Sequence, residues 1–141
     1  MRAALITIII SALLVGCSGN SAENEIVGLW RAVLDEKQLL EAGMKKEAIE
    51  KSATEMKFNS NGTVEIRIID PVNFSINKAN ELVGIYKIKN NRMKISLKKG
   101  TWENQKLTIN GNTMSLEPIE YKGEIVNKFV RIKEWSLKND T

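Results

Sequence analysis

The stretch EMKFNSNGTVEIRII (residues 55–69) predicts the fold class. Apolar and polar residues alternate on both sides of Asn61-Gly62, a pair that favours a two-residue β-hairpin turn. A period of two places every second side chain on the same face of a strand. The apolar residues that would share the core side of this hairpin are Phe58, Val64, Ile66 and Ile68.

The same pattern continues toward the C-terminus. Residues 82–100 predict a second hairpin that turns at Asn90-Asn91, and residues 105–119 predict a third that turns around residues 110–112. Residues 125–135 predict a last strand. Together with a first strand before residue 35, this makes eight or nine short strands, which indicates an antiparallel sandwich or barrel.

The segments on the N-terminal side of the hairpin differ in character. Residues 26–33 are rich in branched and aromatic side chains and predict the first strand, whereas residues 72–76 are a candidate for a further short strand. Residues 35–53 are rich in Glu, Lys, Leu and Ala, and predict two short helices that meet near Gly43. We expect these helices to pack on the barrel as a lid or side wall, with contact to a partner protein as the alternative. Their apolar stripe consists of Leu39, Leu40, Met44, Ala48 and Ile49.

The composition excludes several classes of site. The chain has 141 residues, a formal net charge of +4, one cysteine and no histidine. Without histidine, the commonest general base, the Ser–His and Cys–His pairs and most zinc sites are unavailable. The charge is mild and well mixed, so nucleic acid is not an expected partner. We predict no enzyme activity, metal or cofactor, with a carboxylate-based hydrolase as the alternative. Its acids would come from Asp35, Glu36, Glu41, Glu65 and Asp70.

The N-terminal segment predicts the cellular location. Arg2 precedes an apolar run over residues 5–15, which is shorter than the roughly 20 residues that a membrane-spanning helix needs. The run ends in Leu-Val-Gly-Cys (residues 14–17), which resembles the lipobox of bacterial lipoproteins. The resemblance implies a signal peptide over residues 1–16 and covalent attachment of diacylglycerol and a fatty acyl chain such as palmitate to Cys17. The alternative is an ordinary secretory signal with an incidental cysteine.

A lipoprotein of this kind is anchored in the bacterial cell envelope. Ser18 follows the cysteine where an aspartate would imply retention in the inner membrane, so a Gram-negative source would imply the outer membrane, facing the periplasm. Residues 17–25 are then expected to be a lipidated tether, residues 26–135 the barrel domain and residues 136–141 a loose tail.

Five pieces of the sequence, in this order, resemble the small lipocalin-like (calycin-type) barrels of bacterial lipoproteins. The resemblance implies a mainly β, antiparallel up-and-down barrel of about eight strands, with a short helical insertion after strand one. This chain departs from typical lipocalins in the position of its helices, which in those proteins come near the end of the chain. The pieces are GLW (28–30), FNSNGTVEI (58–66), GIY (84–86), LTINGNTMSL (107–116) and FVRI (129–132).

The resemblance also implies how the barrel closes. The first and last strands would pair, with the Trp30 ring as a plug and the Arg131 guanidinium within about 6 Å of that ring. Gly28, which has no side chain, would let the chain pass close to the neighbouring backbone. An outward, solvated Arg131 is the alternative.

Two functions compete at this point. The first is a binding protein that takes up a small apolar or amphipathic ligand in the barrel. The second is a filled barrel that contacts another envelope protein or a glycan, for example as an inhibitor or accessory factor. A filled barrel would be plugged by Phe58, Ile66, Tyr86, Ile95, Leu107, Met114 and Leu116.

Residues 87–99 carry six cations and no acid. We expect them to form the solvated face of an exposed hairpin, where lysines also discourage pairing between sheet edges. A patch for anionic lipid headgroups, lipopolysaccharide phosphates or glycan carboxylates is the alternative. Trp102 and Trp135 are expected to pack in the core or at a barrel end, with exposed contact residues or membrane-interface anchors as the alternatives. The six cations are Lys87, Lys89, Arg92, Lys94, Lys98 and Lys99.

Overall fold

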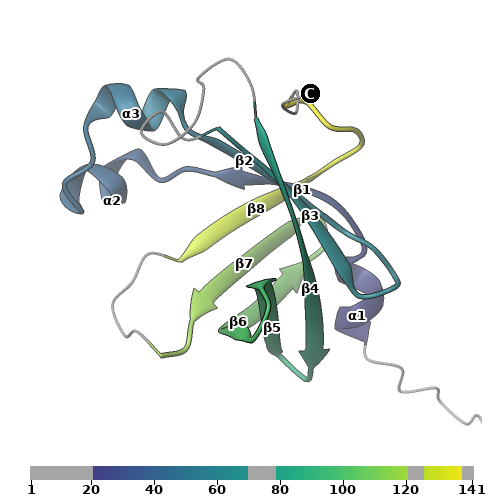
Figure 1. Ribbon diagram of the computed structural model, residues 1–141. Helices are drawn as coiled ribbons and strands as arrows, with labels where there is room; N and C mark the ends of the chain where they lie inside the picture. The colour runs from purple at the N-terminus through teal and green to yellow at the C-terminus, as the bar shows by residue number, and fades with distance from the viewer. Residues whose placement is uncertain (1–20, 70–78, 121–125, 138–141) are drawn as a thin grey trace, which may run out of the picture.

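The computed structural model describes residues 21–69, 79–120 and 126–137. In this part of the chain, eight strands form a closed antiparallel barrel in sequence order, and β8 pairs back with β1 (Figure 1). This confirms the mainly β, up-and-down barrel that the lipocalin-like resemblance implied, and it shows which of the two architectures indicated by the alternation, sandwich or barrel, the chain adopts. The strands are β1 (Gly28–Val33), β2 (Ala53–Phe58), β3 (Thr63–Ile69), β4 (Asn80–Lys89), β5 (Arg92–Lys98), β6 (Thr101–Asn110), β7 (Thr113–Pro118) and β8 (Asn127–Ile132).

The hairpins have the predicted alternation but not every predicted turn. In the β2–β3 hairpin, Met56 pairs with Ile66 and Phe58 with Val64, so inward apolar side chains face one another. The connection between these strands has four residues (59–62), not two, and Gly62 adopts a φ of 85° there. The β4–β5 turn does consist of the two residues Asn90-Asn91, as predicted.

Apolar side chains fill the inside of the barrel. Fourteen buried residues form the core cluster of the described chain, and none is more than 8% exposed. The seven residues predicted to plug the barrel are all among them. The cluster consists of Ile26, Trp30, Met56, Phe58, Val64, Ile66, Tyr86, Ile88, Met93, Ile95, Leu107, Met114, Leu116 and Phe129.

The helical insertion is confirmed, but its packing was predicted wrongly. Helices α2 (Glu36–Glu41) and α3 (Lys46–Lys51) lie between β1 and β2 and project from one rim of the barrel (Figure 1). Leu40 is 44% exposed and Met44 is 37% exposed, whereas Ile49 is buried. The turn at Gly43 (φ 90°) divides the stripe between two six-residue helices, so the stripe does not present one continuous face to the barrel.

A further helix, α1 (Ser21–Ile26), lies at the opposite end of the barrel. Ile26 is fully buried and Ala22 packs against the core cluster. The tether predicted over residues 17–25 is therefore wrong from residue 21 onward, because apolar contacts with the barrel end stabilise a helix there. Residues 17–20 lie outside the described residues, as does the candidate strand over residues 72–76.

One strand departs from simple alternation. Strict alternation after the buried Met93 and Ile95 would place Leu97 on the core side of β5, but Leu97 is 43% exposed and Ser96 is buried. The pairing of β5 with β6 shifts register between Ile95 and Lys98. An irregularity of this kind interrupts the ladder and the period-two pattern that depends on it.

Candidate functional site

One end of the barrel is closed by an arginine lying over a buried tryptophan. Trp30 is 0% exposed, and its indole nitrogen Nε1 donates a hydrogen bond to the Ile26 carbonyl at 2.7 Å. Arg131 pairs with Trp30 across β1 and β8, and its Cζ lies 4.2 Å from the ring centroid. The guanidinium donates to the Val27 carbonyl at 2.9 Å and to the Glu25 carbonyl. The arginine thus joins β8, β1 and the end of α1.

Gly28 makes room for this arrangement. Its backbone φ of 130° is one that residues other than glycine rarely adopt. A Cβ added at this position would lie 2.7 Å from Arg131 Nη1. The structure therefore brings together the three residues for which the resemblance implied barrel closure, Gly28, Trp30 and Arg131. Arg131 does not take the outward, solvated position that was the alternative.

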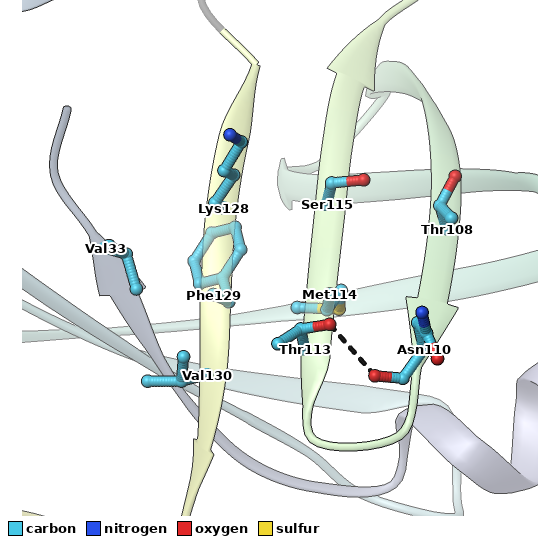
Figure 2. Close-up of a pocket in the computed structure, with 9 residues that line it drawn as sticks. All are labelled: Val33, Thr108, Asn110, Thr113, Met114, Ser115, Lys128, Phe129 and Val130. Carbon is cyan, nitrogen blue, oxygen red and sulfur yellow. Dashed lines mark hydrogen bonds between the residues drawn. The ribbon is translucent and has the colours of Figure 1, made fainter.

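The outer wall over β6, β7, β8 and β1 contains an apolar groove of about 380 Å³, which we call the outer-wall groove (Figure 2). Its apolar lining includes Val33 and Val130, which are 49% and 37% exposed. The side chains of Met114 on β7 and Phe129 on β8 point toward the barrel interior and are buried. The remaining lining residues are polar: Thr108, Asn110, Thr113, Ser115 and Lys128.

Strand register explains why these residues meet. Val33 lies opposite Lys128, and Lys128 lies opposite Ser115, so one row crosses three strands. In a second row, Val130 lies opposite Thr113, whose hydroxyl donates to the Asn110 carbonyl at 2.9 Å. The groove thus combines an apolar floor with one cation and several hydroxyl and amide groups. This suits an amphipathic molecule that carries an anionic or hydrogen-bonding group.

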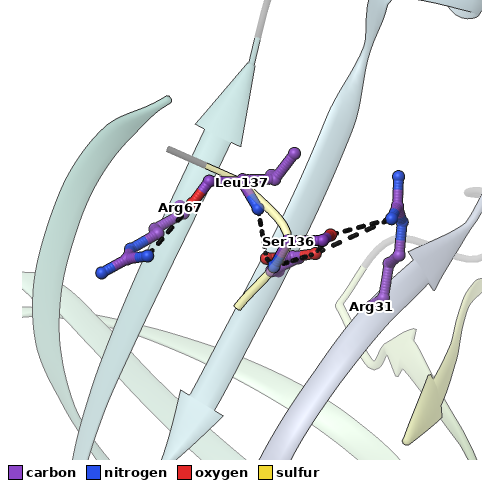
Figure 3. A network of polar contacts seen from close by, with 5 residues as sticks. Arg31, Arg67, Ser136 and Leu137 are labelled. Atoms are coloured by element: carbon purple, nitrogen blue, oxygen red, sulfur yellow. Dashed lines mark hydrogen bonds and ion pairs between the residues drawn. The ribbon is translucent and has the colours of Figure 1, made fainter. Parts of the chain in front are cut away.

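Residues 133–137, which we call the C-terminal clasp, fold back over the outer wall of β1, β2 and β3 (Figure 3). The Glu55 carboxylate, on the outer side of β2, is completely buried beneath this segment. It accepts hydrogen bonds from the backbone N–H groups of Ser136 at 3.0 Å and Leu137 at 3.1 Å, and from the Ser136 hydroxyl. A buried carboxylate is stabilised by such donors, which replace the water it loses.

Two arginines complete the clasp. Arg31 Nη1 lies 3.8 Å from a Glu55 oxygen, and Arg67 donates to the Leu137 carbonyl at 3.0 Å. Arg67 Cζ also lies 4.1 Å from the centroid of the Trp135 ring. The loose tail predicted from residue 136 is therefore wrong at its first two residues, which are held by hydrogen bonds. Residues 138–141 lie outside the described residues.

The carboxylates considered for hydrolysis have structural roles where they are described. Asp35 caps α2 by accepting a hydrogen bond from the Gln38 backbone at 3.1 Å. Glu36, Glu41 and Glu65 each lie 3.6 to 4.0 Å from a lysine nitrogen in partly or fully exposed ion pairs. Asp70 lies outside the described residues. In the described ranges, no group of three His, Cys, Asp or Glu side chains could hold a metal ion.

The predicted lipid-attachment residue, Cys17, also lies outside the described residues. In the part of the chain that is described, the helices are too short or too polar for any of them to cross a membrane.

Comparison with known proteins identifies the family. A family model described as a lipocalin-like domain matches residues 26–116, which run from before β1 into β7. No curated protein matches the chain. The matched region holds Gly28 and Trp30 of the closed end, and the closed barrel adds Arg131 from β8. The chain therefore belongs to the lipocalin-like domain family, whose barrel fold suggests, at a coarse level, the binding of a ligand.

Proposed function

We propose that this chain is a lipid-anchored binding protein of the bacterial cell envelope, at the outer membrane and facing the periplasm. Its ligand is a small amphipathic molecule, held in the outer-wall groove and not inside the barrel. The observation that carries this proposal is the contrast between a filled interior and an open apolar groove. The fourteen core side chains are at most 8% exposed, whereas Val33 and Val130 in the groove are exposed.

The chemistry of the groove supports an amphipathic ligand. Two exposed valines give an apolar surface that water solvates poorly. Lys128 stands at its edge (Figure 2), and no carboxylate of the described residues forms an ion pair with it. An anionic ligand group would therefore meet an uncompensated cation, while its apolar part covers Val33 and Val130. The volume of about 380 Å³ lies within the range typical of small-molecule sites.

A fluorescent probe that shares this chemistry, anilinonaphthalene sulfonate, tests the proposal. The assay uses a form that begins at Ser18, with Val130→Asp to place a charge in the groove and Lys128→Gln to remove the cation. We expect Val130→Asp to weaken binding by at least about tenfold and Lys128→Gln to weaken it several-fold, with loss of its salt dependence. Val83→Asp is the matched control, because Val83 is a 61% exposed valine on β4. Equal binding by the Val130 and Val83 variants would contradict the proposal.

The anchor is tested separately. Replacing Cys17 with serine removes the only thiol in the chain, so we expect an uncleaved or soluble protein. Mass spectrometry of the native protein should show acyl groups on Cys17. Correct processing and membrane association of the Cys17→Ser form after a carbonate wash would show that the lipoprotein assignment is wrong.

A second candidate function is contact with another envelope protein. It is favoured by apolar residues beyond the groove on the rim that carries α2, where Leu34 is 41% exposed and Leu40 is 44% exposed. A photo-crosslinking residue at position 40 would capture such a partner, and one at position 57 on β2 serves as the control. Specific capture at position 40, without probe binding in the groove, would favour protein contact over small-molecule binding.

A further inference from the structure

The structure divides the run of cations between the two ends of β5. Lys87 and Lys89 on β4 lie opposite Lys94 and Arg92 on β5, and Arg92 lies opposite Lys106 on β6. These five exposed residues form one continuous surface near the β4–β5 turn, which we call the basic face. Lys98 and Lys99 lie at the other end of β5 and do not belong to it.

Stability of the sheet does not explain the basic face. Like charges directly opposite one another on neighbouring strands are destabilising. Lysines protect exposed sheet edges from pairing, but β4 and β5 are both paired on each side in a closed barrel. None of the five cations forms an ion pair with a carboxylate of the described residues, although Glu117 lies opposite Lys106 in the register. The charges are therefore available to an anionic partner.

Apolar and aromatic side chains continue the same face. Trp102 on β6 is 36% exposed, and Lys87 Nζ lies 5.2 Å from the centroid of its ring. Ile85, two residues before Lys87 on β4, is 46% exposed. The expected core or end-cap position of Trp102 is therefore wrong, because its ring lies on the outer wall. Basic residues beside an exposed tryptophan are typical of surfaces that lie at a membrane interface.

Helix α1, with which the described residues begin, lies at the end of the barrel near the basic face. Figure 1 shows α1 toward the same end as the β4–β5 turn, and Asn24 of α1 lines one surface cavity together with Tyr86 and Ile88 of β4. Three residues separate Cys17 from α1, so the distance between Cys17 and Ser21 is at most roughly 14 Å. A lipid on Cys17 would thus keep this end of the barrel close to the membrane surface.

We propose that the basic face docks on the anionic headgroups of the membrane that holds the anchor, so that the barrel lies with its β4–β6 wall toward the lipid. This inference rests on the proposed anchor at Cys17. Attraction between clustered lysines and anionic lipid is strong only within about a Debye length, roughly 8 Å at physiological salt, and the short link supplies that proximity. Helix α1 at this end of the barrel carries the exposed acids Glu23 and Glu25, which anionic lipid would repel. We therefore expect the attraction to anionic lipid to act on the β4–β6 wall and not on α1.

Lysine footprinting of the full lipidated chain in vesicles tests this proposal. The vesicles contain phosphatidylcholine alone or with phosphatidylglycerol, and a membrane-impermeant acetylating reagent modifies exposed lysines, which mass spectrometry then quantifies. With phosphatidylglycerol, we expect Lys87, Lys94 and Lys106 to react about fivefold more slowly, and high salt to restore their rates. Lys98 and Lys99 are internal controls and should react equally in both vesicles. If the three lysines of the basic face also react at the same rate in both kinds of vesicle, as the two controls should, the proposal is overturned.

Two further comparisons make the result specific. The double variant Lys87→Gln and Lys94→Gln should fold as the wild type, since it removes opposed like charges, and should lose the protection of Lys106. The control variant Lys98→Gln and Lys99→Gln should keep it. Protection by soluble dextran sulfate but not by phosphatidylglycerol would assign the face to an acidic polymer and overturn membrane docking. Failure of the chain to float with vesicles would instead refute the anchor, a separate outcome.

Discussion

Two arginine–tryptophan pairs in this barrel have nearly the same geometry and very different surroundings. Arg131 Cζ lies 4.2 Å from the Trp30 ring, and Arg67 Cζ lies 4.1 Å from the Trp135 ring. Trp30 is completely buried in the core, whereas Trp135 is partly exposed on the outer wall. A cation–π contact therefore contributes modestly to stability at either place, whereas burial of the tryptophan ring decides how much stability depends on that residue.

The two pairs also define which surfaces remain open. Trp30 and Arg131, together with α1, close one end of the barrel, and the C-terminal clasp covers the wall over β1, β2 and β3. The basic face and the outer-wall groove lie on the rest of the wall. Both proposed recognition surfaces therefore lie on parts of the barrel that neither pair covers.

Trp30→Ala is the substitution from which we expect the largest loss of stability. Removing a fully buried tryptophan leaves a cavity at the closed end, so we expect the free energy of unfolding in urea to fall by about 3–5 kcal/mol. Trp135→Ala, which removes an equivalent cation–π contact on the outer wall, should lower it by only about 1 kcal/mol. Equal losses for the two variants would show that burial does not distinguish them.

Gly28→Ala sharpens the account of the closed end. The methyl group would meet Arg131 Nη1 at 2.7 Å and force an unfavourable φ, so we expect a loss of about 1–3 kcal/mol in unfolding free energy. In an Arg131→Met background, the same change should cost less, because the steric part of the penalty is gone. A full penalty in both backgrounds would mean that Gly28 is needed for its φ alone.

The difference between the two regions also decided what the sequence could predict. The closed end could be anticipated because Gly28, Trp30 and Arg131 match a family pattern at defined positions on the first and last strands. The clasp could not, because Glu55 and Ser136 are 81 residues apart and Glu55 occupies an outward strand position where solvent is the ordinary expectation. Alternation of apolar residues carries no information about a segment that returns over the outer wall.

Other failures had local causes. The apolar residues predicted on the helices do lie in or next to α2 and α3, but the turn at Gly43 separates them into two short groups. The spacing of apolar residues in the sequence does not reveal this separation. The burial of Ser96 in place of Leu97 depends on a register shift between β5 and β6, and period-two reasoning assumes a regular ladder. The outer-wall groove was missed because it forms from residues on four strands that meet only through their register.

Glu55→Gln probes the clasp without changing side-chain shape. The amide keeps one acceptor oxygen but loses the charge that its donors stabilise, so we expect a loss of about 1–2 kcal/mol in unfolding free energy. Hydrogen exchange should be faster at the Ser136 and Leu137 amides, which donate to this carboxylate, and unchanged in the core strands. Faster exchange throughout the barrel would contradict a local role for the clasp.

Tyr86 gives the closed end a weak dependence on pH. Burial, and secondarily the charge of Glu23, raise the pKa of the Tyr86 hydroxyl, which donates to the Asn59 carbonyl at 2.7 Å. A group whose pKa is raised on folding stabilises the folded state at pH values below its unfolded pKa, which is about 10 for tyrosine. This stabilisation is lost as the pH rises through the folded pKa. Between about pH 9 and pH 11, the wild type should therefore lose more stability than Tyr86→Phe. Parallel pH profiles would rule this contribution out.

The barrel is filled with side chains, and we propose that binding takes place on its outer wall. The most direct measurement is methyl NMR of the labelled chain during titration with anilinonaphthalene sulfonate. We expect shifts in the methyl groups of Val33 and Val130, which line the groove, and none in those of Leu107 and Leu116 in the core. Shifts of Leu107 and Leu116, with Val33 and Val130 unchanged, would place the ligand inside the barrel and contradict the proposal.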